Sequence, residues 1–219
     1  MFNGFSQKTV DFMWNLRFNN NREWFEENKE EYTREFLNPM KELAADVFEQ
    51  ISSDYPDHGF IKKVSRIYKD ARRVRGGEPY RTNLWFCIER PAEQWTSTPV
   101  FWFELAPESW SYGLGYYSAK AATMAKLRAR IDDNPKSFEK LIAPFHKQKE
   151  FLLEGEDYKR KKGEHLGNAA YWYNKKSFSM IHTDNIDETL FSSELKSRII
   201  KGFKSLMPLY DYFITLDLD

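Results

Sequence analysis

Cysteine is almost absent from this sequence, which excludes a disulfide framework. The one cysteine, Cys87, stands in the apolar run LWFCIE, where a buried and inert thiol is the typical role. The four histidines, His58, His146, His165 and His182, lack the spacing of metal ligands. We therefore predict neither a metal nor a cofactor.

Long apolar runs and net charge are also missing. The chain begins MFNGFSQKTV without an apolar signal core, and no apolar run approaches the roughly 20 residues that span a bilayer. We therefore expect a cytoplasmic protein without membrane contact. Lys and Arg number 33 and Asp and Glu also number 33, which argues against a general nucleic-acid binder. Any anion site must be local.

Aromatic residues are plentiful, at 17% of the 219 residues. Phe, Tyr and Trp side chains bury large areas, so a core built mainly from them is expected. The length suits one large domain, and no repeat or linker divides the chain. The sequence therefore predicts a single domain over residues 1–219.

The hydrophobic pattern predicts an α+β fold. Apolar residues recur at helical spacing at both ends of the chain and alternate in the middle. We predict an antiparallel sheet of four or five strands packed with helices from the N- and C-terminal regions. The expected strands are 61–69, 83–89, 100–105, 110–117 and, as a fifth, 177–182. The polar stretch 150–175 is expected to be irregular.

Helix starts can be read from capping residues near the N-terminus. Ser6 suits the N-cap of a first helix, and Asn20 with Glu23 three residues later has the capping-box pattern for a second. Asn38 followed by Pro39 predicts the N-cap and first residue of a third helix.

The basic segment, residues 62–81 (KKVSRIYKDARRVRGGEPYR), is the strongest local signal. It holds eight Lys and Arg residues against two acidic residues, a surplus of six positive charges. If the segment is a strand, Arg66, Tyr68, Asp70 and Arg72 point to one face because they lie two residues apart. Such a face suits an anionic ligand, since guanidinium groups bind carboxylates and phosphates through paired hydrogen bonds.

Two interpretations of this face remain open. In the first, Arg66, Lys69, Arg72 and Arg81 form an anion site, with Asp70 orienting one arginine and Tyr68 or Tyr80 donating a hydrogen bond. In the second, the cations form a structural ion-pair network with carboxylates of the second helix. Those carboxylates are Glu23, Glu26 and Glu27.

Further candidates come from the segment REWF at residues 22–25. Arg22 can extend the cationic site, and Trp24 can form a stacking wall for a ligand ring. In a catalytic site, Asp70 or Glu23 would accept a proton and a tyrosine, Tyr80, would donate one.

The sequence resembles an uncharacterised bacterial and fungal family of unknown function. The resemblance rests on NNREWFEENKEEY at 20–32 and RIYKDARRVRGGEPYR at 66–81, which match signature blocks of the form N-x-R-E-W-F-E and R-x-x-[RK]-D-x-R followed by P-Y. Many relatives carry Phe, an Asp or Asn, and Lys where this chain has Arg73, Gly76 and Gly77. The resemblance implies membership, and no established activity comes with it.

Two functions follow as hypotheses. The first is a small-molecule domain, which can also be an enzyme, that binds a carboxylated or phosphorylated ligand through the arginines of the basic segment. The alternative is a non-catalytic interaction module in which the same segment receives an acidic protein segment or nucleic acid. The neutral chain argues against nucleic acid, and the sequence gives no indication of oligomeric state.

Overall fold

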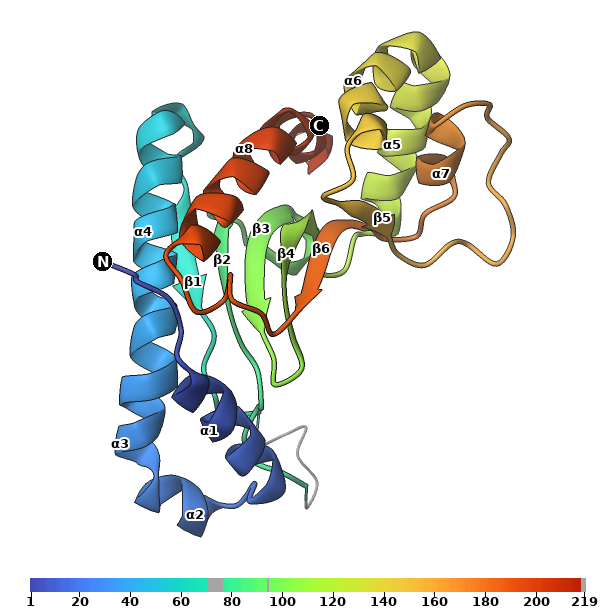
Figure 1. Ribbon diagram of the computed structural model, residues 1–219. Helices are drawn as coiled ribbons and strands as arrows, with labels where there is room; N and C mark the ends of the chain where they lie inside the picture. The colour runs from blue at the N-terminus through green and yellow to red at the C-terminus, as the bar shows by residue number, and fades with distance from the viewer. Residues whose placement is uncertain (71–76, 94, 218–219) are drawn as a thin grey trace. The chain divides into compact units, whose positions relative to one another are not determined.

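An antiparallel six-stranded sheet with the strand order β1-β2-β3-β4-β6-β5 organises the protein (Figure 1). It is seen in a computed structural model, which describes residues 1–70, 77–93 and 95–217. The strands are β1 (Ile61–Val64), β2 (Leu84–Glu89), β3 (Pro99–Leu105), β4 (Ser109–Tyr116), β5 (Leu152–Glu154) and β6 (Ser179–Asn185). The predicted α+β class is confirmed.

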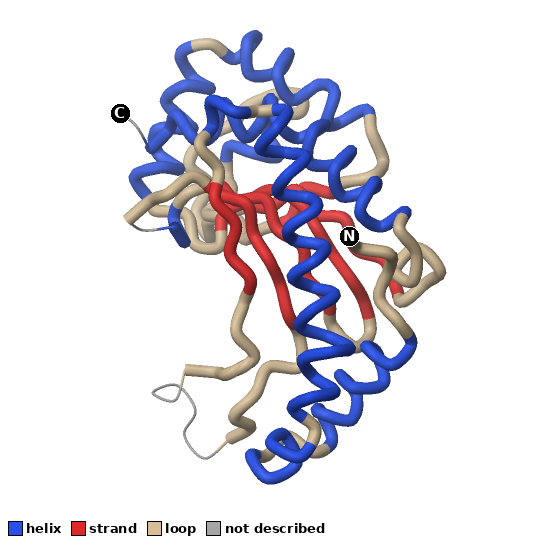
Figure 2. Tube along the Cα trace, turned by 90° about the vertical axis from the view of Figure 1, so that its left-hand side faces the viewer, coloured by secondary structure: helices blue, strands red, loops and turns tan. Residues whose placement is uncertain are grey.

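Helices precede, interrupt and follow the strands in the chain. They are α1 (Gln7–Phe18), α2 (Arg22–Glu27), α3 (Lys29–Glu31), α4 (Asn38–Asp54), α5 (Ala121–Asp133), α6 (Pro135–Lys147), α7 (Ala169–Tyr173) and α8 (Glu194–Ile214). Within the first unit, the long helix α4 packs against β1 (Figure 2). None of the helices in the described part of the chain is long and apolar enough to cross a membrane.

The sixth strand is β5, which the sequence did not predict. It lies inside the stretch 150–175 that was expected to be irregular, and it pairs with β6 through Leu152 opposite Ile181 and Glu154 opposite Ser179. Only three residues long and largely exposed, β5 has too few alternating apolar residues to be recognised. The strand expected over 61–69 is also shorter than predicted, because β1 ends at Val64.

The chain divides into two compact units. The first unit comprises Met1–Ile88, Trp102–Tyr112 and Thr183–Lys201, and the second comprises Glu89–Phe101, Gly113–His182 and Gly202–Asp219. The single domain expected from the sequence remains a prediction.

Each unit has its own aromatic core. In the first, Phe103 stacks on Phe5 and on Phe86, with ring centroids 6.3 and 5.6 Å apart. In the second, Trp172 and Phe178 pack around Phe213, with centroids 5.7 and 5.0 Å from it. These rings bury large areas in dry surroundings, as the aromatic composition predicts.

The third predicted helix start is displaced by one residue, and the capping role of Asn38 is wrong. α4 begins at Asn38 itself and follows without a break from a π-helical segment, Tyr32–Leu37, which joins α3 to α4. The N–H of Asn38 donates to the carbonyl of Thr33, five residues earlier, as a π-helix requires. Pro39, which has no N–H to donate, is accommodated at the end of this wider segment.

The second predicted cap is displaced by one residue. Asn21 caps α2, and its Oδ1 accepts from the backbone N–H of Trp24 at 3.0 Å. Asn20 instead turns its side chain to Tyr80, 60 residues away. The Ser6 cap of α1 is confirmed, with Thr9 completing a capping box.

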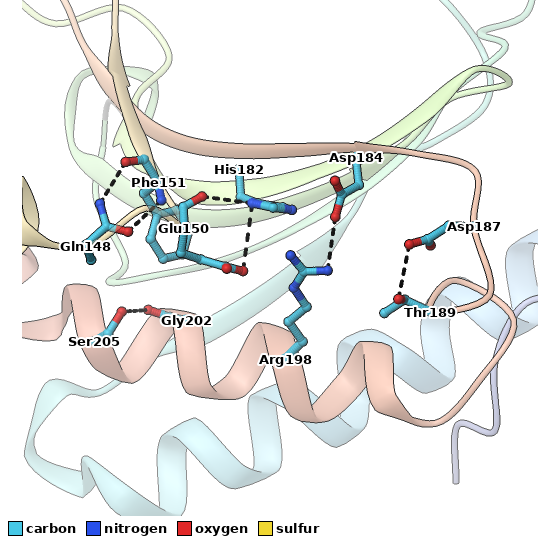
Figure 3. Close-up of polar contacts among 10 residues, drawn as sticks. All are labelled: Gln148, Glu150, Phe151, His182, Asp184, Asp187, Thr189, Arg198, Gly202 and Ser205. Atoms are coloured by element: carbon cyan, nitrogen blue, oxygen red, sulfur yellow. Dashed lines mark hydrogen bonds and ion pairs between the residues drawn. The ribbon is translucent and has the colours of Figure 1, made fainter.

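Polar side chains fix the ends of several elements (Figure 3). In the first unit, the guanidinium of Arg198 on α8 contacts Asp184 on β6 at 3.0 Å and lies 5.2 Å from the Trp110 ring centre. In the second, the side-chain amide of Gln148 accepts from the N–H of Phe151 and donates to its carbonyl, which shapes the turn from α6 into β5.

Candidate ligand-binding site

The two signature blocks lie against each other in the first unit. Asn20 Nδ2 donates to the carbonyl of Tyr80, and the N–H of Tyr80 donates to Asn20 Oδ1, both at 3.0 Å. Phe25 of α2 stacks on the Tyr80 ring with centroids 4.1 Å apart. The asparagine pairs with the backbone of Tyr80 as a neighbouring strand would, so the first block holds the second in place.

The basic segment folds back on itself as an antiparallel bridge between Tyr68 and Tyr80. The N–H of Lys69 donates to the carbonyl of Pro79 at 2.9 Å, and that of Arg81 donates to the carbonyl of Ile67 at 2.7 Å. Arg66, Tyr68 and Asp70 are exposed, whereas Ser65 and Ile67 are buried and Lys69 is half-buried. This alternation follows the predicted two-residue spacing, and Arg72 lies outside the described residues.

The ion pairs of the segment differ from the predicted network. Lys69 Nζ lies 3.3 Å from a carboxylate oxygen of Glu78, inside the segment itself. In α2, Glu26 pairs with Lys29 at 3.1 Å. Among the residues that the structure describes, no ion pair joins Glu23, Glu26 or Glu27 to Arg66, Lys69 or Arg81.

Several predicted residues come together around Tyr80. Its ring lies 5.4 Å from that of Tyr68, and the charge of Arg22 acts on its hydroxyl. Tyr80 is only 2% exposed, and burial raises its pKa. Trp24 points elsewhere, because its ring lies 5.7 Å from Phe12 of α1. The catalytic roles expected for Tyr80, Asp70 and Glu23 remain predictions.

Glu104 on β3 is the carboxyl that sequence reasoning missed. Its Oε2 accepts from Asn83 Nδ2 at 2.8 Å, and the positive charge of Arg81 acts on it. Burial raises the pKa of Glu104, and the contacts with Asn83 and Arg81 offset only part of this rise. The charge of Arg81, a predicted site residue, thus acts on a carboxyl whose pKa is raised by burial.

Glu104 lies on a partly exposed side of the sheet, which we call the outer face and define by Trp85, Trp102, Glu104 and Ser111. The rings of Phe86 and Phe103 touch on the buried side of β2 and β3. Because side chains alternate along a strand, Trp85, Trp102 and Glu104 point to the opposite side. The outer face therefore combines aromatic surface with one carboxyl, on which the charge of Arg81 acts.

A weak signal for Glu104 is present in the sequence. In the strand PVFWFEL it is the one charged residue, and a lone carboxyl in an otherwise apolar strand is uncommon. The sequence does not show that Asn83 and Arg81 lie beside it, because the partners are about 20 residues away and meet only when β2 pairs with β3.

The second unit contains a separate cavity of about 560 Å³ near α7. Its lining includes Lys161, which lies in the basic run KRKK at residues 159–162, together with His165 and Tyr171. Asp132 on α5 fixes the lining residue His165, because its carboxylate lies 2.9 Å from His165 Nε2. The same carboxylate accepts a hydrogen bond from the Tyr173 hydroxyl, also at 2.9 Å. None of the residues predicted for the anion site lines this cavity.

Comparison with known proteins places the chain in a family. Residues 8–212 match the model of the conserved hypothetical protein family DUF2461, so the protein belongs to that family. The match covers nearly the whole chain, as the resemblance implies. No curated protein matches the sequence.

Proposed function

We propose that the protein binds a small carboxylated or phosphorylated molecule through Arg66 and Arg81. The observation that carries the proposal is that neither guanidinium has a carboxylate partner at ion-pair distance within the described residues. Arg66 is exposed and Arg81 is half-buried. A half-buried guanidinium without an ion-pair partner gains from an incoming anion, which replaces part of its lost solvation.

The neighbouring residues support a small ligand over an extended one. The outer face offers Trp85, Trp102 and Glu104, and the charge of Arg81 acts on Glu104, a mixture of aromatic and charged groups that is typical of small-molecule sites. An acidic protein segment or nucleic acid would need a row of cations along its length, whereas Lys69 is already engaged by Glu78.

A thermal-shift titration with sulfate, phosphate and succinate tests the proposal. A ligand that binds only the folded state raises Tm as its concentration passes Kd. We expect the anions to raise the Tm of the wild type, and the Arg66→Ala and Arg81→Ala double variant to lose this rise while remaining folded. Lys41→Ala is the matched control, because Lys41 is exposed on α4.

The opposite result favours the interaction module. If no anion shifts Tm, while the protein binds duplex DNA or an acidic peptide in a salt-sensitive way that the double variant weakens, then small-molecule binding is wrong.

A further inference from the structure

We propose that the cavity near α7 in the second unit binds a small zwitterion, an amino acid with an apolar side chain, between Lys161, Glu164 and His165. The ammonium group of the ligand contacts the Glu164 carboxylate and Nδ1 of His165, and the carboxylate of the ligand contacts the side chain of Lys161. The cavity shares no described residue with the basic segment, so this site goes beyond the proposed function.

His165 supplies a fixed hydrogen-bond acceptor. Asp132 Oδ1 lies 2.9 Å from His165 Nε2, and Asp132 Oδ2 accepts from the Tyr173 hydroxyl at 2.9 Å. A carboxylate can only accept, so Nε2 carries the hydrogen, and Nδ1 of the neutral ring carries a lone pair. The Tyr173 ring packs 4.3 Å from the imidazole, centroid to centroid, and helps to hold its orientation. No hydrogen bond to Nδ1 is found among the described residues, so this atom can accept from an N–H of a ligand.

The charged groups of the lining divide into a paired and an unpaired set. Lys175 Nζ lies 3.1 Å from Asp157 Oδ1 and donates to the carbonyl of Gly155 at 3.0 Å, so the charges of Lys175 and Asp157 offset each other. For Lys161 and Glu164 no ion pair is found within the described part of the chain. One positive and one negative charge are left to meet a ligand, which matches a zwitterion better than a simple anion or a simple cation.

The segment 161–166, which carries these groups, is fastened at several points. Asn174 Oδ1 accepts from the N–H of Lys162 at 2.8 Å, and Asn174 Nδ2 donates to the carbonyl of Gly163 at 3.2 Å. Gly163 packs so closely on Tyr173 that a Cβ at this position would lie 2.6 Å from the ring. Because Asp132 also holds His165, the ligand does not have to order the segment, and a site that is already ordered binds at a lower entropic cost.

Apolar surface in the same cavity accommodates the side chain of the ligand. Leu166 and Tyr171 both line the cavity, and they are 93% and 63% exposed. The cavity volume of about 560 Å³ lies within the range of small-molecule sites, roughly 300–1,000 Å³. Such sites combine apolar side chains with a few polar groups that fix the orientation of the ligand, as this cavity does.

An NMR titration with L-leucine at pH 7.5, where leucine is a zwitterion, tests the inference. Labelling the histidines with ¹⁵N makes the Nδ1 resonance of His165 observable, and we expect leucine to move it. The analogues 4-methylpentanoate, which lacks the ammonium group, and 3-methylbutylamine, which lacks the carboxylate, should each bind about three- to tenfold more weakly than leucine.

Charge variants assign the two ends of the ligand. Glu164→Gln should weaken leucine binding about three- to tenfold and leave the binding of 4-methylpentanoate unchanged, because that acid has no ammonium group. Lys161→Ala should weaken leucine binding to a similar extent and leave the binding of 3-methylbutylamine unchanged. Glu154→Gln and Lys159→Ala are the matched controls and should bind leucine as the wild type does, because both side chains are exposed and outside the lining.

The outcomes separate this inference from the proposed function. If leucine does not bind, or if both analogues bind as tightly as leucine, the zwitterion site is wrong, while anion binding through Arg66 and Arg81 is decided by its own titration. Loss of leucine binding in the Arg66→Ala and Arg81→Ala double variant would show that the ligand binds the basic segment, and the assignment to this cavity would be wrong. If a cavity variant does not fold, intermolecular NOEs in the wild type decide the matter: they must join the methyl groups of leucine to Leu166 and Tyr171.

Discussion

Thr9 is a buried polar residue whose hydroxyl supplies a hydrogen bond to a backbone carbonyl that the helix leaves without its usual donor. Its hydroxyl donates to the carbonyl of Glu35 at 2.5 Å and accepts from the N–H of Ser6 at 3.2 Å. Glu35 lies in the π-helical segment just before Pro39, where the ring nitrogen supplies no hydrogen to the preceding turn. One threonine therefore joins the start of α1 to the irregular turn before α4.

At this scale we predict that Thr9→Val destabilises the protein. Valine keeps the shape but leaves a buried carbonyl without its donor, which typically costs about 1–3 kcal/mol. Chemical denaturation followed by circular dichroism measures the loss of unfolding free energy. Thr9→Ser, which keeps the hydroxyl, should lose less than Thr9→Val, and equal losses would contradict the assigned role of the hydrogen bond.

Residues that are distant in the sequence also change the chemistry of single side chains. Glu104 differs from an exposed glutamate because protein replaces water around it, Asn83 donates a hydrogen bond to it and the charge of Arg81 acts on it. Tyr80 differs from an exposed tyrosine because Phe25 covers its ring. Neither difference is visible in the order of residues along the chain.

Between elements, the two signature blocks are joined by one asparagine. Asn20 satisfies both the N–H and the carbonyl of Tyr80, and Tyr80 is followed by Arg81 of the candidate site. The position of Arg81 therefore depends on the loop between α1 and α2.

We predict that Asn20→Ala both destabilises the protein and weakens anion binding. Two part-buried backbone groups lose their partners, so we expect a loss of about 1–3 kcal/mol in unfolding free energy. The Kd for sulfate should rise because Arg81 is less well positioned. Asn19→Ala is the control, since Asn19 is exposed and its side chain bonds only to the nearby carbonyl of Asn15 within the described residues. Equal effects of the two changes would refute the positioning role of Asn20.

At the scale of a whole unit, pH acts on the second unit through His146. The indole N–H of Trp172 donates to His146 Nε2 at 2.9 Å, so the imidazole accepts this bond in its neutral form. Burial lowers the pKa of His146, and the charge of Glu139 offsets only part of this effect. The unfolded chain therefore binds this proton more readily than the folded protein does.

It follows that stability should fall as the pH falls through the ordinary histidine value of 6.5. Above that value neither state is protonated at His146, and below it the unfolded state is favoured until the lower folded pKa is passed. The slope has an upper limit of about 1.4 kcal/mol per pH unit for one proton. Denaturation between pH 8 and 5 should show a smaller loss for His146→Gln, whose amide oxygen can accept from Trp172 without titrating. An equal or larger loss in this variant would show that His146 does not control the pH response.

The sequence by itself determined the features that depend on near neighbours along the chain. Short alternating or continuous apolar segments marked β2, β3, β4 and most of β6, and capping chemistry marked the start of α1, because these signals act over a few residues. The excess of cations in 62–81 likewise identified the segment that contains Arg66 and Arg81.

Tertiary structure decided what depends on distant partners. Asn20 has the pattern of a helix cap, but its side chain bonds to Tyr80. There it makes two hydrogen bonds with the backbone, whereas a cap makes one with the first turn of the helix. Asn38 and Pro39 stand at the start of α4, but Asn38 does not cap it, because the preceding π-helical turn continues into α4. Glu104 has the pattern of an ordinary strand residue, and only the fold lets Asn83 donate to it and the charge of Arg81 act on it. Desolvation and charge act through space, so the character of this carboxyl is set by the fold and not by its neighbours in sequence.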